Sequence, residues 1–289
     1  MRYKVRHSTR YAYPTAVDLA SHVLRLRPRE LAHQRVIQTQ VTADPPAARL
    51  SDGIDHFGNH VTWMFHDFPH QHFLVTLEAE IDVAPPPPPD PAMTLPWEQV
   101  ASACRRDASA WKAAEFVFPS ARAPADGAVA VYVEKSFPAE RPILAGLLDL
   151  LARIRRDFKF QSGVTTITTP VGRVLEQRAG VCQDFSHLMI SGLRGLGLPA
   201  RYVSGYIRTR PPAGIAPRRG VDQSHAWVGC WLGPVHGWID LDPTNNLIVA
   251  DEHVVLAWGR DFGDVSPVRG VILGGGRHGI KVSVDLQPA

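Results

Sequence analysis

A single cysteine, Cys182, lies where an amphipathic helix should begin. Gly180 precedes this segment, and two glycines and a proline follow it, so Cys182 is expected in the first helical turn. The unpaired N–H groups and the positive dipole end of a helix stabilise a thiolate over a thiol. Cys182 is therefore a candidate nucleophile, although a lone cysteine is more often a small buried hydrophobe. The apolar residues that recur at helical spacing and predict the buried stripe are Phe185, Leu188, Met189, Leu193 and Leu196.

Two short runs downstream of the cysteine have the alternation of a β-hairpin. The first, residues 224–232, places His225 on one face, and the second, residues 235–244, places Asp240 and Asp242 on one face. These faces also carry three tryptophans, which are candidate walls of a substrate site or else core packing. They are Trp227, Trp231 and Trp238.

The turn between the two runs decides which aspartate meets the histidine. If Gly233 and Pro234 form a two-residue turn, His225 falls opposite Asp242. Opposed side chains lie about 5 Å apart at Cβ, so a carboxylate there would hold one imidazole nitrogen. The other nitrogen is then free for the thiol, which is the arrangement of thiol catalysis. A longer turn would shift the register toward Asp240, which stays the reserve candidate.

Several motifs resemble those of the transglutaminase-like superfamily, whose members are related to papain, in the bacterial form with an N-terminal domain. In the second half they are RAGVCQDFSHLM, GLPARYVSGYI, SHAWVGCW and GWIDLDPTNN; in the first half they are HSTRYAYPTAV, LRLRPRE and DHFGNHVTW. The resemblance implies Cys182 as nucleophile, His225 as base and Asp242, rather than Asp240, as the third member. The sequence has no dinucleotide-binding fingerprint, so we expect no cofactor.

The fold expected from these patterns is α+β, with a β-rich domain followed by a papain-like core. Short alternating runs predict an N-terminal β domain over residues 1–84, and the proline run at 85–92 predicts an extended linker. Residues 93–250 predict the transglutaminase-like core, in which the cysteine helix packs on an antiparallel sheet. Helical spacing is found in residues 94–115 and 142–158. Residues 251–289 predict a last β segment that returns to a sheet.

Composition argues against several kinds of partner. With 31 basic and 28 acidic residues the net charge is +3, which indicates neither nucleic acid nor a charged membrane surface as a partner. Absence of an apolar leader or a membrane-length apolar run predicts a cytoplasmic protein. Three cysteines without metal-ligand spacing fit a reducing compartment. Histidines 56, 60, 66, 70 and 72 permit a metal site, but no supporting ligand pattern accompanies them, so we expect no metal.

The function predicted from these residues is attack of a cysteine on amide bonds of a peptide or protein through a thioester. Hydrolysis of a peptide or isopeptide is favoured, and acyl transfer to an amine is the alternative. No calcium-binding loop is evident, so activity should not need calcium. A non-enzymatic scaffold is the alternative from another class, and a metal-dependent hydrolase is a weaker one. The polar loop at 209–223, with Arg218 and Arg219, is expected to form a rim for the substrate.

Overall fold

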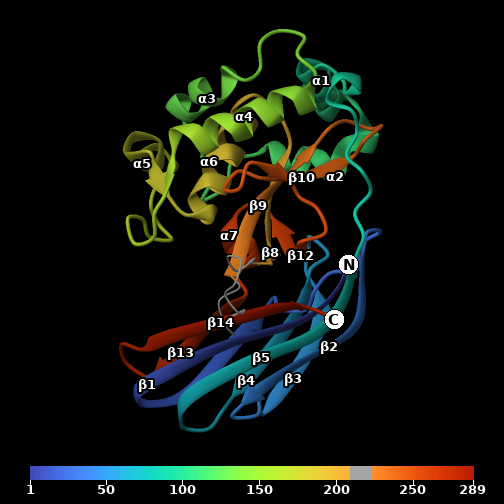
Figure 1. The fold of residues 1–289 in the computed structure, drawn as a ribbon. Helices are drawn as coiled ribbons and strands as arrows, with labels where there is room; N and C mark the ends of the chain where they lie inside the picture. Colours follow the sequence, from blue (N-terminus) through green and yellow to red (C-terminus); the bar gives the residue numbers. More distant parts are fainter. Residues whose placement is uncertain (209–222) are drawn as a thin grey trace, which may run out of the picture.

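A computed structural model describes residues 1–208 and 223–289. The molecule has a large sheet at one end, a smaller sheet in the middle and helices at the other end (Figure 1). The segment of residues 84–96 connects the large sheet to the helical part and contains no β-strand. The α+β class predicted from the sequence is confirmed. Arg218 and Arg219, in the predicted rim loop, lie outside the described residues.

The large sheet contains the N-terminal strands and the last strands of the chain. Its path is β2-β5-β1-β4-β3, and two further strands, β13 and β14, both pair with β1. Residues more than 240 positions apart, such as Val5 and Leu286, are therefore cross-strand neighbours. The strands are β1 (Arg2–Leu24), β2 (Gln34–Asp44), β3 (Arg49–Ile54), β4 (His60–His66), β5 (His70–Val83), β13 (Val268–Gly274) and β14 (Gly279–Pro288).

The smaller sheet positions the candidate site. Its order is β11-β10-β9-β8-β12, and the two-stranded β6 (Lys159–Phe160) and β7 (Ala179–Gly180) lie apart from it. Strand β12 lies beyond the predicted core boundary at residue 250 and completes this sheet. The strands are β8 (Ala200–Ile207), β9 (Gln223–Trp231), β10 (Trp238–Asp242), β11 (Leu247–Ile248) and β12 (His253–Gly259).

Helices cover the face of this sheet that lies away from the N-terminal domain (Figure 1). The prediction for residues 142–158 is confirmed by α4, whereas the helix predicted over 94–115 is broken after α1. The break lies at Asp107, whose backbone is extended and whose carboxylate accepts hydrogen bonds from Ser109 instead. The helices are α1 (Trp97–Arg106), α2 (Trp111–Ala114), α3 (Gly127–Glu134), α4 (Ile143–Asp157), α5 (Val171–Gln177), α6 (Cys182–Gly195) and α7 (Phe262–Val265).

Helix α6 is central because it contacts α3, α5 and the strands β8 and β9. Its stripe of Phe185, Leu188, Met189 and Leu193 is buried, as the periodicity predicts. Gly192 permits close contact with α3, since a Cβ there would lie 2.2 Å from a methyl carbon of Val133. A larger residue at 192 would push α6 away from α3 and displace the helix start that carries the cysteine.

Two amide side chains of the N-terminal domain join it to β12. Gln34 bonds both backbone groups of Val255, at 2.8 Å each, and Asn59 bonds both backbone groups of Trp258, at 2.9 Å each. On the outer edge of the smaller sheet, these side chains bond the backbone N–H and C=O groups that a further strand would otherwise bond. The contact fixes the position of the N-terminal domain against the core.

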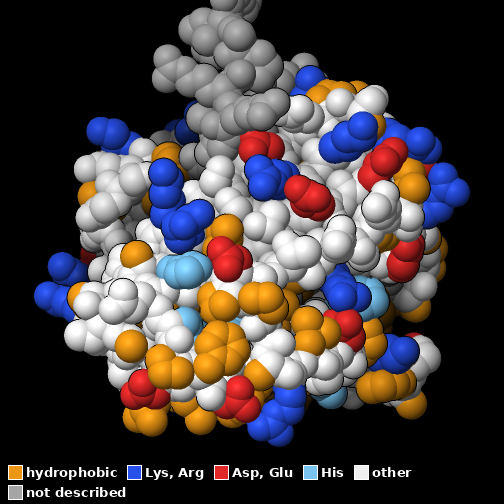
Figure 2. Space-filling model, turned by 90° about the horizontal axis from the view of Figure 1, so that it is seen from below, with side chains coloured by type: hydrophobic (Ala, Val, Ile, Leu, Met, Phe, Trp, Pro, Cys, Tyr) orange, Lys and Arg blue, Asp and Glu red, His pale blue; other side chains and the backbone are white. Residues whose placement is uncertain are grey.

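The surface of the N-terminal domain carries exposed apolar side chains. Leu19 and Leu273 are cross-strand neighbours and are 38% and 63% exposed, and Trp63 and Val271 are also exposed. Figure 2, seen from the side of this domain, shows hydrophobic side chains gathered among charged ones. None of the helices in the described ranges has the length and apolar character needed to span a bilayer.

Candidate active site

Cys182 is the first residue of α6, as its sequence context predicts. The preceding turn is fixed by Asp184, whose carboxylate accepts the Val181 N–H at 2.8 Å and the Thr165 hydroxyl at 2.7 Å. Gly180 makes room for this cap, because a Cβ there would lie 2.7 Å from the Asp184 carboxylate. The first N–H groups of a helix have no intrahelical partner, so they surround the half-buried thiol with hydrogen-bond donors.

The hairpin that carries the histidine and the aspartates has a longer turn than predicted. Trp231 pairs with Trp238, and Gly229 pairs with Asp240, so the two-residue turn at Gly233 and Pro234 is wrong. The chain closes instead through Leu232, whose N–H donates to the Gly237 carbonyl at 2.7 Å. Positive φ angles at Gly233 and Gly237 permit this wider loop. The register moves by two residues relative to the prediction.

Despite this shift, His225 meets Asp242 and not the reserve candidate. The His225 Nε2 atom lies 2.7 Å from the Asp242 carboxylate. Asp240 accepts the Trp227 indole N–H at 3.0 Å, so each aspartate binds the residue diagonally across the hairpin rather than the one directly opposite. A shift of two residues leaves every side chain on its original face, which is why the predicted pair still meets.

The Cys182 thiol lies close enough to the imidazole of His225 to raise its pKa. Burial lowers the pKa of His225, but the hydrogen bonds to Asp242 and Cys182 outweigh it and raise the pKa to about 10. An ionised carboxylate can only accept, so Nε2 carries a proton and Nδ1 faces the thiol. The structure thus brings together Cys182, His225 and Asp242, the residues predicted as nucleophile, base and third member.

Asp242 is fully buried and accepts five hydrogen bonds. Two are from the backbone N–H groups of Thr244 and Asn245, at 2.9 and 3.1 Å. The others are from His225, from the Asn245 side chain at 2.7 Å and from His253 Nε2 at 3.3 Å. Burial raises the pKa of Asp242, but these donors outweigh burial and hold the pKa well below its usual range. The carboxylate is therefore ionised and fixed in orientation.

Two of these donors, Asn245 and His253, were not among the predicted site residues. Asn245 had a signal in the sequence, because an aspartate followed by Pro-Thr-Asn favours a turn that returns N–H groups to the carboxylate. His253 had none, since it is on β12 and its closeness to Asp242 depends on the order of strands in the sheet. Its buried Nδ1 has no partner among the described residues.

Metal binding between His225, Asp242 and His253 would disrupt existing hydrogen bonds. His225, Asp242 and His253 have ligand atoms within 4.8 Å of one another. The Asp242 oxygen between the two histidines already accepts three hydrogen bonds, which a metal would have to replace. In the N-terminal domain, the rings of buried His66 and His70 are tilted by 45° and have their centroids 5.3 Å apart. This pair forms no ligand group with a third histidine, cysteine or carboxylate in the described ranges.

The three tryptophans occupy different places. Trp227 is fully buried, and its ring packs against His225 and His253 with centroid distances of 6.1 and 5.2 Å. Trp231 is buried in the main core. Trp238 lines a cavity between the two domains and packs edge-on against Phe116. Trp227 therefore supports the imidazole from behind, whereas Trp238 lines the cavity between the domains.

Cys182 should be alkylated first among the three free cysteines. Cys104 and Cys230 are buried, and burial raises the pKa of both thiols. Cys182 is half-buried and has His225 beside it, so we expect it to react at least ~100-fold faster with iodoacetamide. Peptide mass mapping over a time course measures the three rates. Equal labelling of all three in the folded protein would contradict an activated thiol.

Comparisons with known proteins show the family to which the chain belongs. Residues 3–82 match the bacterial transglutaminase-like N-terminal region, and residues 135–243 match the transglutaminase-like superfamily. An uncharacterised protein of Mycobacterium tuberculosis is 39% identical over 99% of this chain and 93% of its own length. A protein-glutamine gamma-glutamyltransferase of Pseudomonas aeruginosa is 38% identical over 25% of this chain and 11% of its own length. A Cytophaga hutchinsonii crystal structure, provisionally described as a cysteine protease, superposes with a TM-score of 0.76 at 20% identity, covering 99% of this chain and 90% of that one.

Proposed function

This chain belongs to the transglutaminase-like superfamily, in the form with the bacterial N-terminal region, and we propose that it hydrolyses amide bonds of peptides or proteins through a thioester. The observation that carries the proposal is the contact of one imidazole with both Cys182 and Asp242. Asp242 fixes the tautomer and orientation of His225, and His225 then exchanges protons with the thiol.

In the acylation step the Cys182 sulfur attacks the carbonyl carbon of the amide. The carbonyl oxygen becomes an oxyanion, which the free N–H groups at the start of α6 stabilise. Collapse of this intermediate breaks the C–N bond, and the imidazolium of His225 gives its proton to the leaving nitrogen. The products of the step are an amine or ammonia and a thioester on Cys182.

In the second step a water molecule enters where the amine has left and hydrolyses the thioester. His225, now neutral, takes a proton from water as the water oxygen attacks the thioester carbon. The C–S bond breaks, the carboxylic acid leaves, and the thiolate and imidazolium are restored. Asp242 stays ionised throughout, because its five donors stabilise the carboxylate.

Acyl transfer to an amine is the second candidate, and the match to a protein-glutamine gamma-glutamyltransferase favours it. The same three residues would serve both reactions, since they differ only in the acceptor. Transfer needs a site from which water is excluded. The tryptophan closest to His225 is buried behind the imidazole, so it does not supply an apolar channel for an amine. We therefore favour hydrolysis, and we place the enzyme in the cytoplasm, where three unpaired cysteines stay reduced.

Competition between water and an amine tests the proposal. The enzyme is incubated with a library of glutamine-containing peptides and with an isopeptide, each in the presence of a millimolar primary amine. Intact-mass spectrometry then detects the Cys182 thioester and separates acid from amide products. We expect mainly the acid, with or without calcium. A predominant amine adduct would support transfer, and no thioester with any amide would support the scaffold.

A further inference from the structure

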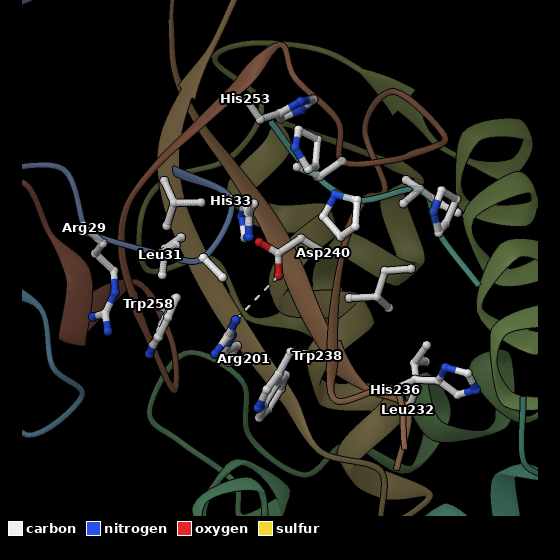
Figure 3. Close-up of a pocket in the computed structure, with 18 of the residues that line it drawn as sticks. Arg29, Leu31, His33, Arg201, Leu232, His236, Trp238, Asp240, His253 and Trp258 are labelled. Carbon is white, nitrogen blue, oxygen red and sulfur yellow. Dashed lines mark ion pairs between the residues drawn. The ribbon is translucent and has the colours of Figure 1, made fainter. Parts of the chain in front are cut away.

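A cavity of about 1560 Å³ lies between the two domains (Figure 3). Its walls come from the N-terminal domain at Arg29 and Leu31, from the linker at residues 85–89, and from the core at Arg201 and Trp238. Cys182, His225 and Asp242 do not line it. The cavity is larger than most small-molecule sites, and its place at a domain interface is typical of them.

One guanidinium in this wall is held by the sheet. Arg201, Gly229 and Asp240 occupy one row across β8, β9 and β10. The glycine lets the arginine cross β9, because a Cβ there would lie 2.7 Å from Arg201 Nε and 2.9 Å from the Asp240 carboxylate. The guanidinium carbon lies 3.7 Å from the Trp258 ring centroid and 4.3 Å from that of Trp238. Its planar surfaces are thus covered and its position is fixed.

The hydrogen-bond donors of Arg201 are not satisfied within the described parts of the chain. The residue is 8% exposed, its Nε is buried without a partner, and it forms no hydrogen bond shorter than 3.5 Å there. Its ion-pair partner, Asp240, is 3.7 Å away (dashed line in Figure 3). The Asp240 carboxylate also accepts the Trp227 indole N–H. Buried arginines normally have acceptors for their five donors.

Arg194 shows how the same protein treats a structural arginine. It is 6% exposed, and its donors reach the carbonyls of Phe116, Ala200 and Arg260 at 2.7 to 2.9 Å. Lack of acceptors at Arg201 is therefore a property of the cavity and not of buried arginines in this fold.

A second guanidinium adds to the positive charge of the wall. Arg29 lies with its guanidinium carbon 3.5 Å from the Trp258 ring centroid, so the two arginines must occupy opposite faces of that indole. Arg29 Nε also has no partner. Burial lowers the pKa of each arginine to about 10, so both are cations at neutral pH. Asp240 pairs with Arg201, whereas Arg29 forms no ion pair with a carboxylate in the described ranges, which leaves about one positive charge beside Trp258 to be met. Elsewhere in the wall, Lys112 lies with Glu115 and Asp251.

We propose that this cavity binds a small organic monocarboxylate, with its carboxylate at the edge of Arg201 and its apolar body against the proline linker. A planar carboxylate fits the in-plane donors of a guanidinium whose faces are already covered. A single negative charge matches the excess beside Trp258, whereas a dianion such as phosphate would be repelled by Asp240. Leu31, Trp111 and prolines 85–89 provide the apolar surface.

Binding to the intact protein is tested with 4-phenylbutyrate, its neutral amide 4-phenylbutanamide, and inorganic phosphate at constant ionic strength. Isothermal titration calorimetry should show one site for the carboxylate, with the amide and phosphate bound at least tenfold more weakly. The carboxylate alone should also raise the unfolding temperature. Equal binding of acid and amide, tighter binding of phosphate, or no binding of the acid would overturn the proposal.

Variants separate a binding arginine from a structural one. Arg201→Met should bind acid and amide equally and should unfold at the wild-type temperature or above, because it removes a buried charge whose ion-pair partner lies 3.7 Å away. Arg194→Met, the matched control, should unfold at a lower temperature while binding the carboxylate as the wild type does. Arg201→Lys, which keeps the charge, should bind the acid with reduced affinity. Equal destabilisation by both methionine variants would make Arg201 a structural residue.

None of these measurements uses an amide substrate or the Cys182 thiol. Failure of the carboxylate site would therefore leave the proposed hydrolysis intact, and failure of hydrolysis would leave the site intact.

Discussion

Cys182→Ala and His225→Ala should each lower kcat by about a million-fold, and the double variant should be no slower than either single one. The reason is that the two residues act as one unit. Without the thiol no thioester forms, and without the imidazole the thiol loses both the partner that stabilises its charge and the donor for the leaving nitrogen. Single-turnover kinetics, followed by intact mass on an amide found in the competition experiment, measure each rate.

Cys104→Ala is the matched control, because it removes a thiol that is buried on α1 away from the site. This variant should retain wild-type kcat. If the fold-loss in kcat of the double variant equalled the product of the two single fold-losses, the residues would act independently. Such a result would be incompatible with a nucleophile and base in contact.

Asp242→Asn should lower kcat/KM by about 10,000-fold, while Asp240→Asn should lower it by no more than about tenfold. An asparagine at 242 presents an amide where the carboxylate accepts from His225, so the imidazole loses its preferred tautomer and the charge that raises its pKa. Asp240 instead accepts the Trp227 indole N–H and pairs with Arg201, so its loss affects residues that do not hold the imidazole by a hydrogen bond. Steady-state kinetics and the rate of iodoacetamide labelling of Cys182 both report the difference.

Thermal unfolding of both variants provides the control, since each aspartate also has a structural partner. A loss of activity that follows the loss of folded protein would not count as a catalytic effect. If Asp240→Asn were the slower variant among folded proteins, the assignment of Asp242 as the third member would be wrong.

Much of the candidate site follows from local patterns in the sequence. Cys182 was expected at a helix start because apolar residues recur every three or four positions and glycines bound the segment. Asp240 and Asp242 were expected on the face of His225 because strand side chains alternate with a period of two. These inferences held because they depend on backbone periodicities that a few neighbouring residues set.

The pairing register of β9 and β10 was harder to predict from the sequence. It depends on the loop between β9 and β10, where Gly237 adopts a positive φ and the chain closes over more residues than the two predicted. The face of each strand was nevertheless right, since the register changed by an even number of residues.

What the sequence by itself determined was therefore which residues are candidates for the chemistry and on which face of an element each lies. Only the tertiary structure decided their partners. Strand β12 places His253 beside Asp242, β13 and β14 return to pair with β1, and the domains meet around Arg29, Arg201 and Trp258. These contacts join residues from 11 to 285 positions apart, and they are set by strand order and burial of whole surfaces. Local periodicity carries no information about either, so no short stretch of the chain could have revealed them.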